Sequence, residues 1–306
     1  MKILVTGGAG FIASQIADEY INEGHQIFIL DNLTTGFEKN INLKAQFIRE
    51  DICSSAIISL FEKEKFDVVN HHAAQIDVRK SVNDPVFDAN TNILGTINLL
   101  QASIKTGVKK FIFASTGGAI YGEQEYFPAD EKHPTNPVSP YGITKLTIEK
   151  YLYFYRNEYG LKYSILRYAN VYGPRQNPFG EAGVVAIFTN KLLRNENPVI
   201  NGNGKQTRDY VFVEDVVKAN VIALNDNSSE IYNVGTGTET SVNELFLKLN
   251  KVAGNKAEEK HGPAPKGEQL RSVISSAKLF NRFKWKPSIK IDEGLQKTFN
   301  FFSSIN

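Results

Sequence analysis

The sequence is poor in cysteine and has no long apolar run. Its single cysteine, Cys53, excludes an intramolecular disulfide framework and is typical of a reducing compartment; we interpret it as a small apolar side chain. Residues 1–5 are apolar but too few to span a membrane, and they run into glycines instead of a cleavage site. The sequence therefore predicts a cytoplasmic protein without a signal peptide or membrane association.

An excess of charge of one sign is also missing. The 306 residues carry 35 Lys and Arg against 33 Asp and Glu, a formal net charge of +2 at pH 7. This balance argues against a dedicated nucleic-acid-binding protein, although it permits a local basic pocket. Internal repeats, low-complexity tracts and heptads are absent as well, and the composition is that of an ordinary globular protein.

Short apolar runs alternate with helical stretches through the first half of the chain. Residues 2–6, 26–30, 45–49, 68–70 and 110–115 are predicted strands. The spacing of apolar residues predicts helices over 12–23, 55–63 and 91–105. Because this alternation favours parallel pairing with helices on both faces, the sequence predicts an α/β fold with a doubly wound parallel sheet.

A second region is predicted beyond about residue 172. Upstream of residue 172, Ser139 and Pro140 suit the start of a helix that ends at Gly160. A strand is predicted after this helix, over residues 163–168. Downstream of residue 172, predicted loops over 173–183, 195–205 and 254–267 separate short helices. We therefore predict domains at 1–171 and 172–306, the second a smaller substrate-binding α/β domain, with a segment near 211–235 packing back on the first.

A glycine-rich turn at residues 6–13 (TGGAGFIA) joins the first predicted strand to the first helix. Read from Gly8 it matches G-x-G-x-x-A. Glycines let backbone N–H groups approach a pyrophosphate at a helix N-terminus, and a small residue lets helix and strand pack closely. The turn predicts a dinucleotide site; a purely structural glycine turn is the alternative.

Other polar residues follow the predicted strands. Asp31, about 20 residues beyond the glycines, suits hydrogen bonds to an adenosine ribose and would repel a 2′-phosphate, so NAD is favoured over NADP. Asp51 and Ile52 suit the adenine. For both aspartates an ordinary turn or strand-end role stays open. We interpret His71 and His72 as buried or hydrogen-bonded histidines, because no metal-ligand spacing accompanies them, and we predict no metal site.

Tyr141 and Lys145 lie four residues apart on a predicted helix, so their side chains share one face. A tyrosine with its ordinary pKa near 10 is a poor base at neutral pH. A neighbouring ammonium and a positively charged nicotinamide would favour the phenolate and make proton transfer possible. Such a pair arises by chance in many helices, but here it follows a dinucleotide turn, so the sequence predicts a nicotinamide-dependent enzyme.

Several segments together resemble the extended short-chain dehydrogenase/reductases, and among them the UDP-glucose (UDP-galactose) 4-epimerase family. The resemblance covers nearly the whole chain. It is carried by residues 6–13, 31–33, 72–74, 92–96, 115–122, 139–145, 167–175 and 208–215. It implies a Rossmann fold, tightly bound NAD, a UDP-sugar substrate and a homodimer formed by helices near 91–105 and 141–159.

The resemblance also implies a catalytic triad of Thr116, Tyr141 and Lys145. Counting forward from the fifth strand selects Thr116, whereas counting back from Tyr121 selects Gly117, which has no hydroxyl; Ser115 is the fallback. In the implied mechanism Tyr141 removes the 4-hydroxyl proton while hydride passes from C4 to NAD⁺. The 4-keto sugar then rotates about its pyrophosphate link and receives the hydride on its opposite face.

Ligand-binding residues are implied in the same way. Those for NAD are Gly7, Gly10, Phe11, Ile12, Asp31, Asn32, Asp51, Ile52, Ala73, Ala74, Gln75, Asn92, Tyr141, Lys145 and Tyr168. Those for the nucleotide sugar are Thr116, Asn170, Val184, Arg208, Tyr210 and Glu268.

The chain departs from the family at four positions near the substrate. Asn201 stands where an aromatic is common, and Pro265 where an arginine is common, for which Arg271 is a candidate substitute. Glu268 replaces an aspartate, so the resemblance favours UDP but leaves dTDP and GDP open. Ser272 replaces a bulky tyrosine of some relatives, which predicts that N-acetylated sugars are accepted.

The residues around the predicted triad also argue against functions other than epimerisation. A 4,6-dehydratase needs an acid pair after the catalytic threonine, where this chain has Gly117 and Gly118. A uronate epimerase or a decarboxylase needs a group for the C6 carboxylate, and none is found. A non-catalytic dinucleotide-sensing module would tolerate loss of Tyr141 or Lys145, and both are present.

Overall fold

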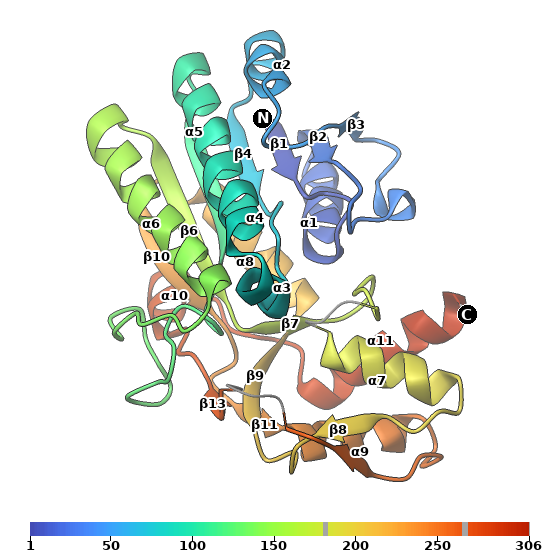
Figure 1. Ribbon diagram of the computed structural model, residues 1–306. Helices are drawn as coiled ribbons and strands as arrows, with labels where there is room; N and C mark the ends of the chain where they lie inside the picture. Colours follow the sequence, from blue (N-terminus) through green and yellow to red (C-terminus); the bar gives the residue numbers. More distant parts are fainter. Residues whose placement is uncertain (180–182, 265–268, 306) are drawn as a thin grey trace.

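The computed structural model describes residues 1–179, 183–264 and 269–305. Its centre is a seven-stranded sheet in the order β10-β6-β5-β4-β1-β2-β3, in which every pairing is parallel (Figure 1). The strands are β1 (Lys2–Thr6), β2 (Gln26–Asp31), β3 (Gln46–Arg49), β4 (Val68–His71), β5 (Lys110–Thr116), β6 (Lys162–Tyr168) and β10 (Glu230–Val234). The predicted doubly wound fold is confirmed.

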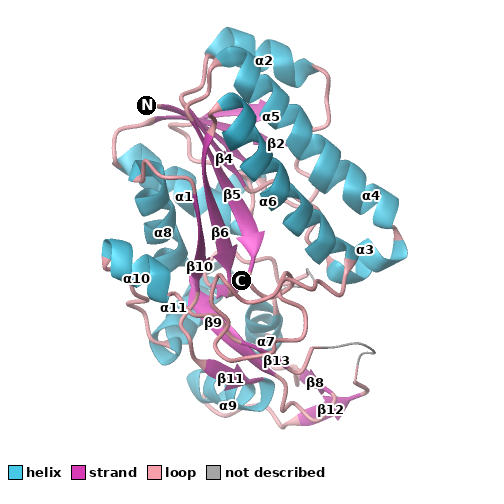
Figure 2. Ribbon diagram, turned by 90° about the vertical axis from the view of Figure 1, so that its left-hand side faces the viewer, coloured by secondary structure: helices cyan, strands magenta, loops and turns pink. Residues whose placement is uncertain are grey.

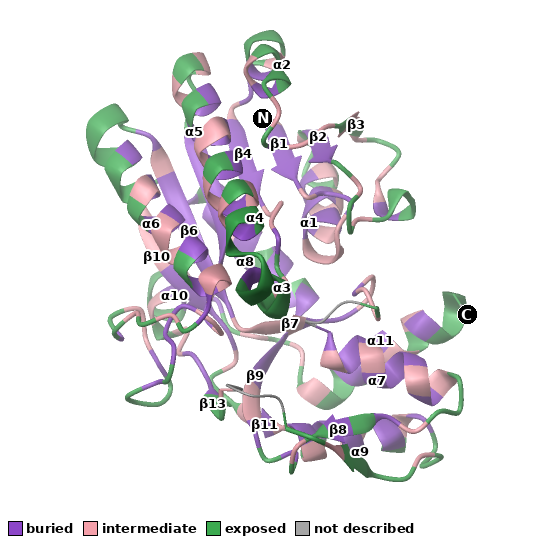
Figure 3. Cartoon of the chain, in the orientation of Figure 1, coloured by how far each residue is buried: buried purple, intermediate pink, exposed green. Residues whose placement is uncertain are grey.

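Helices cover both faces of this sheet. Helices α1 (Phe11–Asn22) and α8 (Val213–Asn225) lie on one face, and α2 (Ala56–Glu64), α5 (Gly95–Thr106) and α6 (Pro140–Tyr159) lie on the other (Figure 2). Alternate residues of β1 enter the two cores: Ile3 and Val5 pack with α1 and α8, whereas Leu4 packs with α2 and α5. Burial on both faces explains why the strands read as continuous apolar runs (Figure 3).

The predicted elements of this half agree with the structure to within one or two residues, with one exception. The helix predicted over 91–105 is a π-helical turn (Asn90–Leu94) continued by α5, and it is preceded by two short helices, α3 (Val78–Asn83) and α4 (Pro85–Ala89). Asp77 and Asp84 cap these two helices. Each is too short to produce a helical period in the sequence.

A smaller second layer forms most of the remaining chain. Strands β7 (Asn170–Tyr172), β9 (Thr207–Phe212), β11 (Glu239–Ser241) and β13 (Arg271–Ser272) make one sheet, and β8 (Val199–Asn201) pairs with β12 (Lys260–Gly262). Helices α7 (Val184–Leu193), α9 (Val242–Val252) and α11 (Ile291–Ile305) share an apolar core with them. The remaining elements are η1 (Glu38–Asn40) and α10 (Ala277–Phe283).

Two expectations about this layer and the turns are corrected. The segments 195–205 and 254–267, expected as loops, contain β8 and β12, whose three residues are too few to show an alternating pattern. Cys53, expected as a small apolar side chain, is exposed in the turn after β3. The division at residue 171 stays a prediction, since the chain returns to the first sheet at β10. No helix in the described ranges is long and apolar enough to cross a membrane.

Candidate active site

The glycine turn between β1 and α1 depends on close backbone packing. Gly7 has a φ of +69°, and a Cβ atom there would lie 2.7 Å from the backbone nitrogen of Ala73. Its N–H donates to Leu30 at 2.8 Å, and the N–H of Gly10 donates to Gly7 at 2.9 Å. A side chain at Gly7 would be strained and would push away the loop after β4.

The turn lies where the strand order reverses. From β1 the chain proceeds to β2 and β3 on one side and to β4, β5 and β6 on the other, so the crevice at the carboxyl ends of β1 and β4 is the usual ligand position of such a sheet. Helix α1 begins here at Phe11 and Ile12 with Gly10 as its N-cap and no side-chain cap. Its first N–H groups are therefore available to a phosphate.

Asp31 ends β2 beside this turn. Its carboxylate is buried and accepts hydrogen bonds from the N–H groups of Ala9 at 3.0 Å and Leu33 at 2.8 Å. Two carboxylate oxygens have about four acceptor sites, so capacity remains for a ribose. The glycine turn, the uncapped helix and this carboxylate together fit an adenosine dinucleotide.

Asn32 and Asp51 lie next to Asp31. The Asn32 amide donates to the Asp51 carboxylate at 2.7 Å, and the N–H of Cys53 donates to it at 2.8 Å. Burial acts to raise the pKa of Asp51, but these hydrogen bonds outweigh it and the pKa lies below its ordinary value. Ile52 is buried beside them, so the structure brings together the four residues assigned to the adenosine end of NAD.

Two histidines end β4. His71 is buried between the hydroxyls of Thr6 at 2.7 Å and Thr96 at 2.8 Å, and burial lowers its pKa well below the ordinary value. The Nε2 atom of His72 lies 3.0 Å from the Tyr168 hydroxyl, and burial together with Lys145 lowers its pKa to about 3. Both histidines are hydrogen-bonded, and His71 is also buried whereas His72 is half-buried, which agrees with their interpretation as buried or hydrogen-bonded residues.

The loop after β4 fits a ligand only in part. The buried Nδ1 atom of His72 has no hydrogen-bond partner among the described residues, and Ala73 and Ala74 follow it with small side chains. Gln75 and Asn92, which the resemblance assigns to NAD, bind each other instead: the Gln75 N–H donates to Asn92 at 2.8 Å, and the Asn92 amide donates to the Gln75 carbonyl at 2.9 Å. Both side chains are buried.

Helix α6 carries the predicted catalytic pair. It begins after Ser139, whose hydroxyl accepts from the Gly142 N–H at 3.2 Å, and it ends at Gly160 with a φ of 74°, as predicted. The Nζ atom of Lys145 lies 5.9 Å from the ring centre of Tyr141 and donates to the carbonyl of Ala114 at 2.9 Å. The helix places both side chains beside the end of β5.

The protein alone does not favour the Tyr141 phenolate. Burial raises the pKa of Tyr141 above its ordinary value, and the nearby Asp88 carboxylate raises it further. Burial also lowers the pKa of Lys145 to about 8, against the opposing charges of Asp88 and Glu149. Lys145 by itself therefore does not favour the Tyr141 phenolate, contrary to the expectation from the sequence. A further positive charge is needed in the site.

Thr116 and Ser115 end β5 but point in different directions. Ser115 is buried and donates to Glu149 at 2.7 Å. Thr116 accepts from the Ala119 N–H at 3.2 Å. A Cβ atom at Gly118 would lie 3.8 Å from the Thr116 hydroxyl and 3.6 Å from the Asn170 amide oxygen, so Thr116 and Asn170 border the same space. This geometry favours Thr116 over Ser115 as the catalytic hydroxyl.

The residues assigned to the nucleotide sugar gather on the second sheet. Asn170 of β7 pairs with Tyr210 of β9, and Arg208 of β9 pairs with Ser272 of β13. Tyr210 is buried in the apolar core, whereas Arg208 is half-buried. Val184 begins helix α7, which has no side-chain cap, so its N–H remains available.

Of four further positions near the substrate, the structure describes two, Arg271 and Asn201. Arg271 forms two hydrogen bonds to the carboxylate of Glu239, at 2.9 and 2.7 Å, and its guanidinium lies 3.7 Å from the ring centre of Phe127. The Arg271 guanidinium is therefore already bound by Glu239 and Phe127 of this chain. Asn201 is exposed on β8. Pro265 and Glu268 lie outside the described residues.

The sequence reasoning missed three buried charged residues around α6. Glu149 accepts from Arg167 of β6 at 3.0 Å as well as from Ser115, and both members of the pair are almost fully buried. Asp88 of α4 is fully buried near Tyr141. Glu149 lies one helical turn after Lys145 and could have been found from that spacing. Asp88 had no such signal, because its helix was not predicted.

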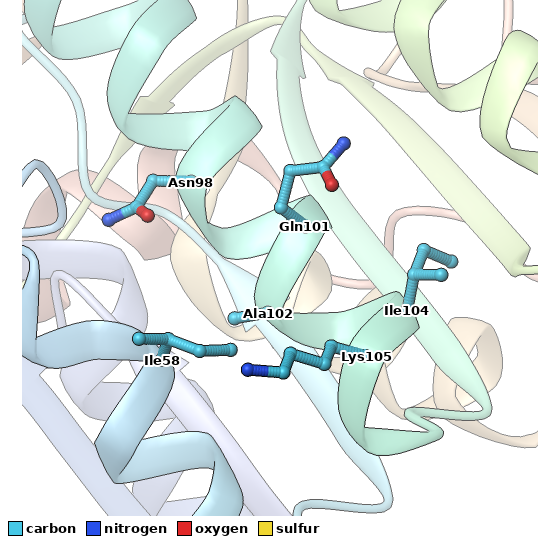
Figure 4. A pocket seen from close by; sticks show the side chains of 6 residues that line it. All are labelled: Ile58, Asn98, Gln101, Ala102, Ile104 and Lys105. Carbon is cyan, nitrogen blue, oxygen red and sulfur yellow. The ribbon is translucent and has the colours of Figure 1, made fainter.

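A separate surface pocket lies between α2 and α5 (Figure 4). The only charged residue lining it is Lys105, which pairs with Glu62 on the surface. The lining residues are Ile58, Asn98, Gln101, Ala102, Ile104 and Lys105. Among the residues that the structure describes, no predicted catalytic or binding residue lines this pocket.

Several known proteins are similar to this chain over nearly its whole length. The family described as NAD dependent epimerase/dehydratase matches residues 3–235. A putative UDP-glucose 4-epimerase from Methanocaldococcus jannaschii is 49% identical over 304 residues, 99% of each chain. The structure of a UDP-glucose 4-epimerase with UDP-glucose from Thermotoga maritima has a TM-score of 0.98 at 47% identity, covering 100% of this chain and 99% of that one. A Thermus thermophilus UDP-glucose 4-epimerase in complex with NAD has a TM-score of 0.94 at 42% identity, covering 99% of each.

Proposed function

The chain belongs to the NAD-dependent epimerase/dehydratase family, and we propose that it interconverts UDP-glucose and UDP-galactose by inverting C4 of the sugar. The observation that carries this proposal is the position of Thr116, Tyr141 and Lys145 next to the dinucleotide crevice. All three lie at or beside the carboxyl end of β5, with Asn170 bordering the same space as Thr116. The likeness to a structure containing UDP-glucose supports the choice of substrate.

NAD is the cofactor of this family, and the crevice fits it. The N–H groups at the start of α1 would hold the pyrophosphate, Asp31 the adenosine ribose, and Lys145 and Tyr168 would lie toward the nicotinamide end. When bound, NAD supplies the redox chemistry by accepting hydride from C4 and returning it. A bound oxidised nicotinamide would also bring the additional positive charge that Tyr141 needs.

Each residue of the triad has a separate task. Tyr141 takes the proton of the sugar 4-hydroxyl and later returns one to the 4-keto oxygen, so a single group acts as base and then as acid. Lys145 stabilises the phenolate and is held in place by the Ala114 carbonyl. Thr116 hydrogen-bonds the 4-oxygen. Protons and hydride are both returned, so the enzyme ends each cycle unchanged.

The second sheet would hold the nucleotide diphosphate. Arg208 suits a diphosphate because a guanidinium forms forked hydrogen bonds to phosphate oxygens. Asn170 and the N–H of Val184 would add neutral donors, at a strand and at a helix N-terminus. Ser272, paired with Arg208 across β13 and β9, is a small side chain where the family resemblance implies a bulky tyrosine in some relatives. We therefore include UDP-GlcNAc and UDP-GalNAc among the expected substrates.

We also propose a homodimer formed through α5 and α6. Tyr153 and Phe154 are adjacent aromatic residues of α6 and are 61% and 49% exposed, so this helix presents apolar area to solvent that a second copy could cover. Tyr155, between α6 and the sheet core, is buried instead. Size-exclusion chromatography with light scattering tests the proposal, and a monomer at micromolar concentration would refute it.

The catalytic proposal has a direct test. The purified holoenzyme is incubated with UDP-galactose, without added reductant or NAD, and the products are separated by chromatography. We expect UDP-glucose to accumulate to a constant ratio, and the same ratio to be reached from UDP-glucose. Accumulation of a 4-keto-6-deoxy sugar would instead identify a dehydratase, and no conversion would refute the proposal.

A further inference from the structure

Asp88 is a buried carboxylate whose charge acts on both Tyr141 and Lys145, and the triad does not use it. Its side chain is 0% exposed on the short helix α4, and none of its hydrogen bonds comes from a charged group in the described part of the chain. We propose that Asp88 is a positioning residue of the active site, which anchors the first turn of α6 and supplies a fixed negative charge to Tyr141 and Lys145. The catalytic roles of those two residues rest on the function proposed above.

The anchoring follows from three hydrogen bonds. The Oδ1 atom of Asp88 accepts from the side-chain amides of Gln75 at 3.0 Å and Asn92 at 3.1 Å. Its Oδ2 atom accepts from the hydroxyl of Thr144 at 3.0 Å. Two of these donors belong to the loop after β4 and to the π-helical turn, and the third belongs to α6. One carboxylate therefore connects the cofactor loop to the catalytic helix.

Thr144 transmits this anchor to the catalytic residues. It stands immediately before Lys145, and its hydroxyl also lies 2.9 Å from the carbonyl of Tyr141. A displacement of Asp88 would thus move the turn that carries both side chains. The π-helical turn at Asn90–Leu94 supports the same inference, because such turns within helices frequently occur at functional sites.

The charge of Asp88 acts on the pair because its partners are neutral amides and a hydroxyl. The other buried carboxylate near Lys145, Glu149, is compensated by Arg167 at hydrogen-bond distance. The Asp88 carboxylate raises the pKa of both Tyr141 and Lys145. It therefore keeps Lys145 protonated to higher pH and, by the same field, delays the ionisation of Tyr141.

Other groups around the pair do not provide this charge. His71, at the end of β4, and the following His72 are neutral near pH 7, because burial lowers the pKa of each. Arg79 and Lys80 of α3 are exposed to solvent, which screens them. Phe113 of β5 offers only its ring to Lys145, at 4.7 Å. Asp88 thus sets the pH range in which the pair works.

Two variants separate the charge from the anchor. Asp88→Asn keeps the shape and the acceptor for the two amides but removes the charge. Thr144→Val keeps the charge but removes the link to α6. Both are compared with the parent protein loaded with NAD, without sugar, by titrating the ultraviolet absorbance of tyrosinate and subtracting the same titration of the corresponding Tyr141→Phe protein. The melting temperature of each variant is recorded in parallel.

We expect Tyr141 to ionise about one pH unit lower in Asp88→Asn than in the parent, and at an unchanged pH in Thr144→Val. In the pH dependence of kcat, the acid and alkaline limbs should both move to lower pH in Asp88→Asn alone. Asp88→Ser provides a second uncharged variant if the asparagine variant does not fold.

Equal ionisation of Tyr141 in Asp88→Asn and the parent would overturn the proposal and leave Asp88 a purely structural residue. The same shift in both variants would assign the effect to helix position and would also overturn the charge role. The titration needs no sugar. If the parent converts no UDP-sugar while Tyr141 still responds to Asp88, the proposed function fails and the inference about Asp88 stands.

Discussion

The Nζ atom of Lys145 lies 5.9 Å from the ring centre of Tyr141, and its hydrogen bond goes to the Ala114 carbonyl instead of to the phenol. The two side chains therefore interact electrostatically, without a direct hydrogen bond between them. In such surroundings a change of one charge alters the protonation of both, which makes the pair sensitive to its buried neighbours.

Tyr141→Phe should lower the turnover of UDP-galactose by about 10²- to 10⁴-fold, because the variant has no group to exchange the proton of the 4-hydroxyl. The melting temperature should change little, since the ring remains. Tyr153→Phe is the matched control on the same helix, where the side chain is 61% exposed, and it should retain full turnover. A coupled assay for UDP-glucose measures both, and full activity in Tyr141→Phe would remove that residue from the mechanism.

Lys145 should make the stability of the cofactor-free protein depend on pH. Burial lowers the pKa of Lys145 from 10.5 to about 8. Between these values the unfolded chain keeps a proton that the native site has released, so the free energy of unfolding rises with pH in this range. The wild type should gain up to about 3 kcal/mol relative to Lys145→Met between pH 8 and 10.5.

Urea unfolding at a series of pH values measures this difference. Below about pH 8 the native and unfolded states both hold the proton, so the wild type and Lys145→Met should differ by a constant amount there. Lys110 titrates in a similar range, but it is present in both proteins and its contribution cancels. A constant difference over the whole range would show that Lys145 keeps its ordinary pKa in the fold.

The sequence predicted the sheet and the crevice because both depend on local patterns. The TGGAGFIA turn, the apolar strands and the Ser139–Pro140 helix start each occupy a few adjacent residues, and the structure contains all three. The π-helical turn and helices α3 and α4 escaped prediction, since capping by Asp77 and Asp84 determines them more than apolar spacing does. Their omission also hid Asp88.

The substrate side was less predictable for a different reason. Arg208 and Ser272 come together only through the pairing of β13 with β9, two segments more than 60 residues apart in the chain. Whether Arg271 could bind a phosphate depended on whether a carboxylate of the protein pairs with it. Strand β11 brings Glu239 within hydrogen-bond distance of Arg271. Long-range pairings of such short strands leave no period in the sequence.

Asp31 should control the choice between NAD and NADP. Asp31→Asn removes the charge that would repel a 2′-phosphate while keeping one acceptor for the Leu33 N–H. The preference for NAD should fall by about 10- to 100-fold, the value of one charged hydrogen bond. Titration of the cofactor-free protein with both dinucleotides measures it. Asp51→Asn, whose partners are Asn32 and Cys53, should leave the preference unchanged, and an unchanged preference in Asp31→Asn would contradict the assignment.

Arg208 and Arg271 should differ in their effect on substrate binding. Arg208→Ala should raise the KM for UDP-galactose about 10- to 100-fold with a smaller effect on kcat, because a charged hydrogen bond to the diphosphate is lost from both the ground state and the transition state. Arg271→Ala should change KM less than threefold, since its guanidinium is paired with Glu239. Initial rates over a range of UDP-galactose concentrations separate the two, and a larger effect from Arg271 would reverse the assignment.

Ser272 should determine whether N-acetylated sugars are accepted. The residue is 3% exposed and pairs with Arg208 in the second sheet, and the family resemblance aligns it with the bulky tyrosine of some relatives. Ser272→Tyr should lower kcat/KM for UDP-GalNAc about 100-fold relative to UDP-galactose, as expected where a bulky group excludes the acetyl substituent. Ser272→Ala keeps the small volume and should leave the ratio unchanged, which separates volume from the loss of the hydroxyl. If the parent enzyme turns over UDP-galactose but not UDP-GalNAc, the position does not admit the acetyl group and the wider substrate range is refuted.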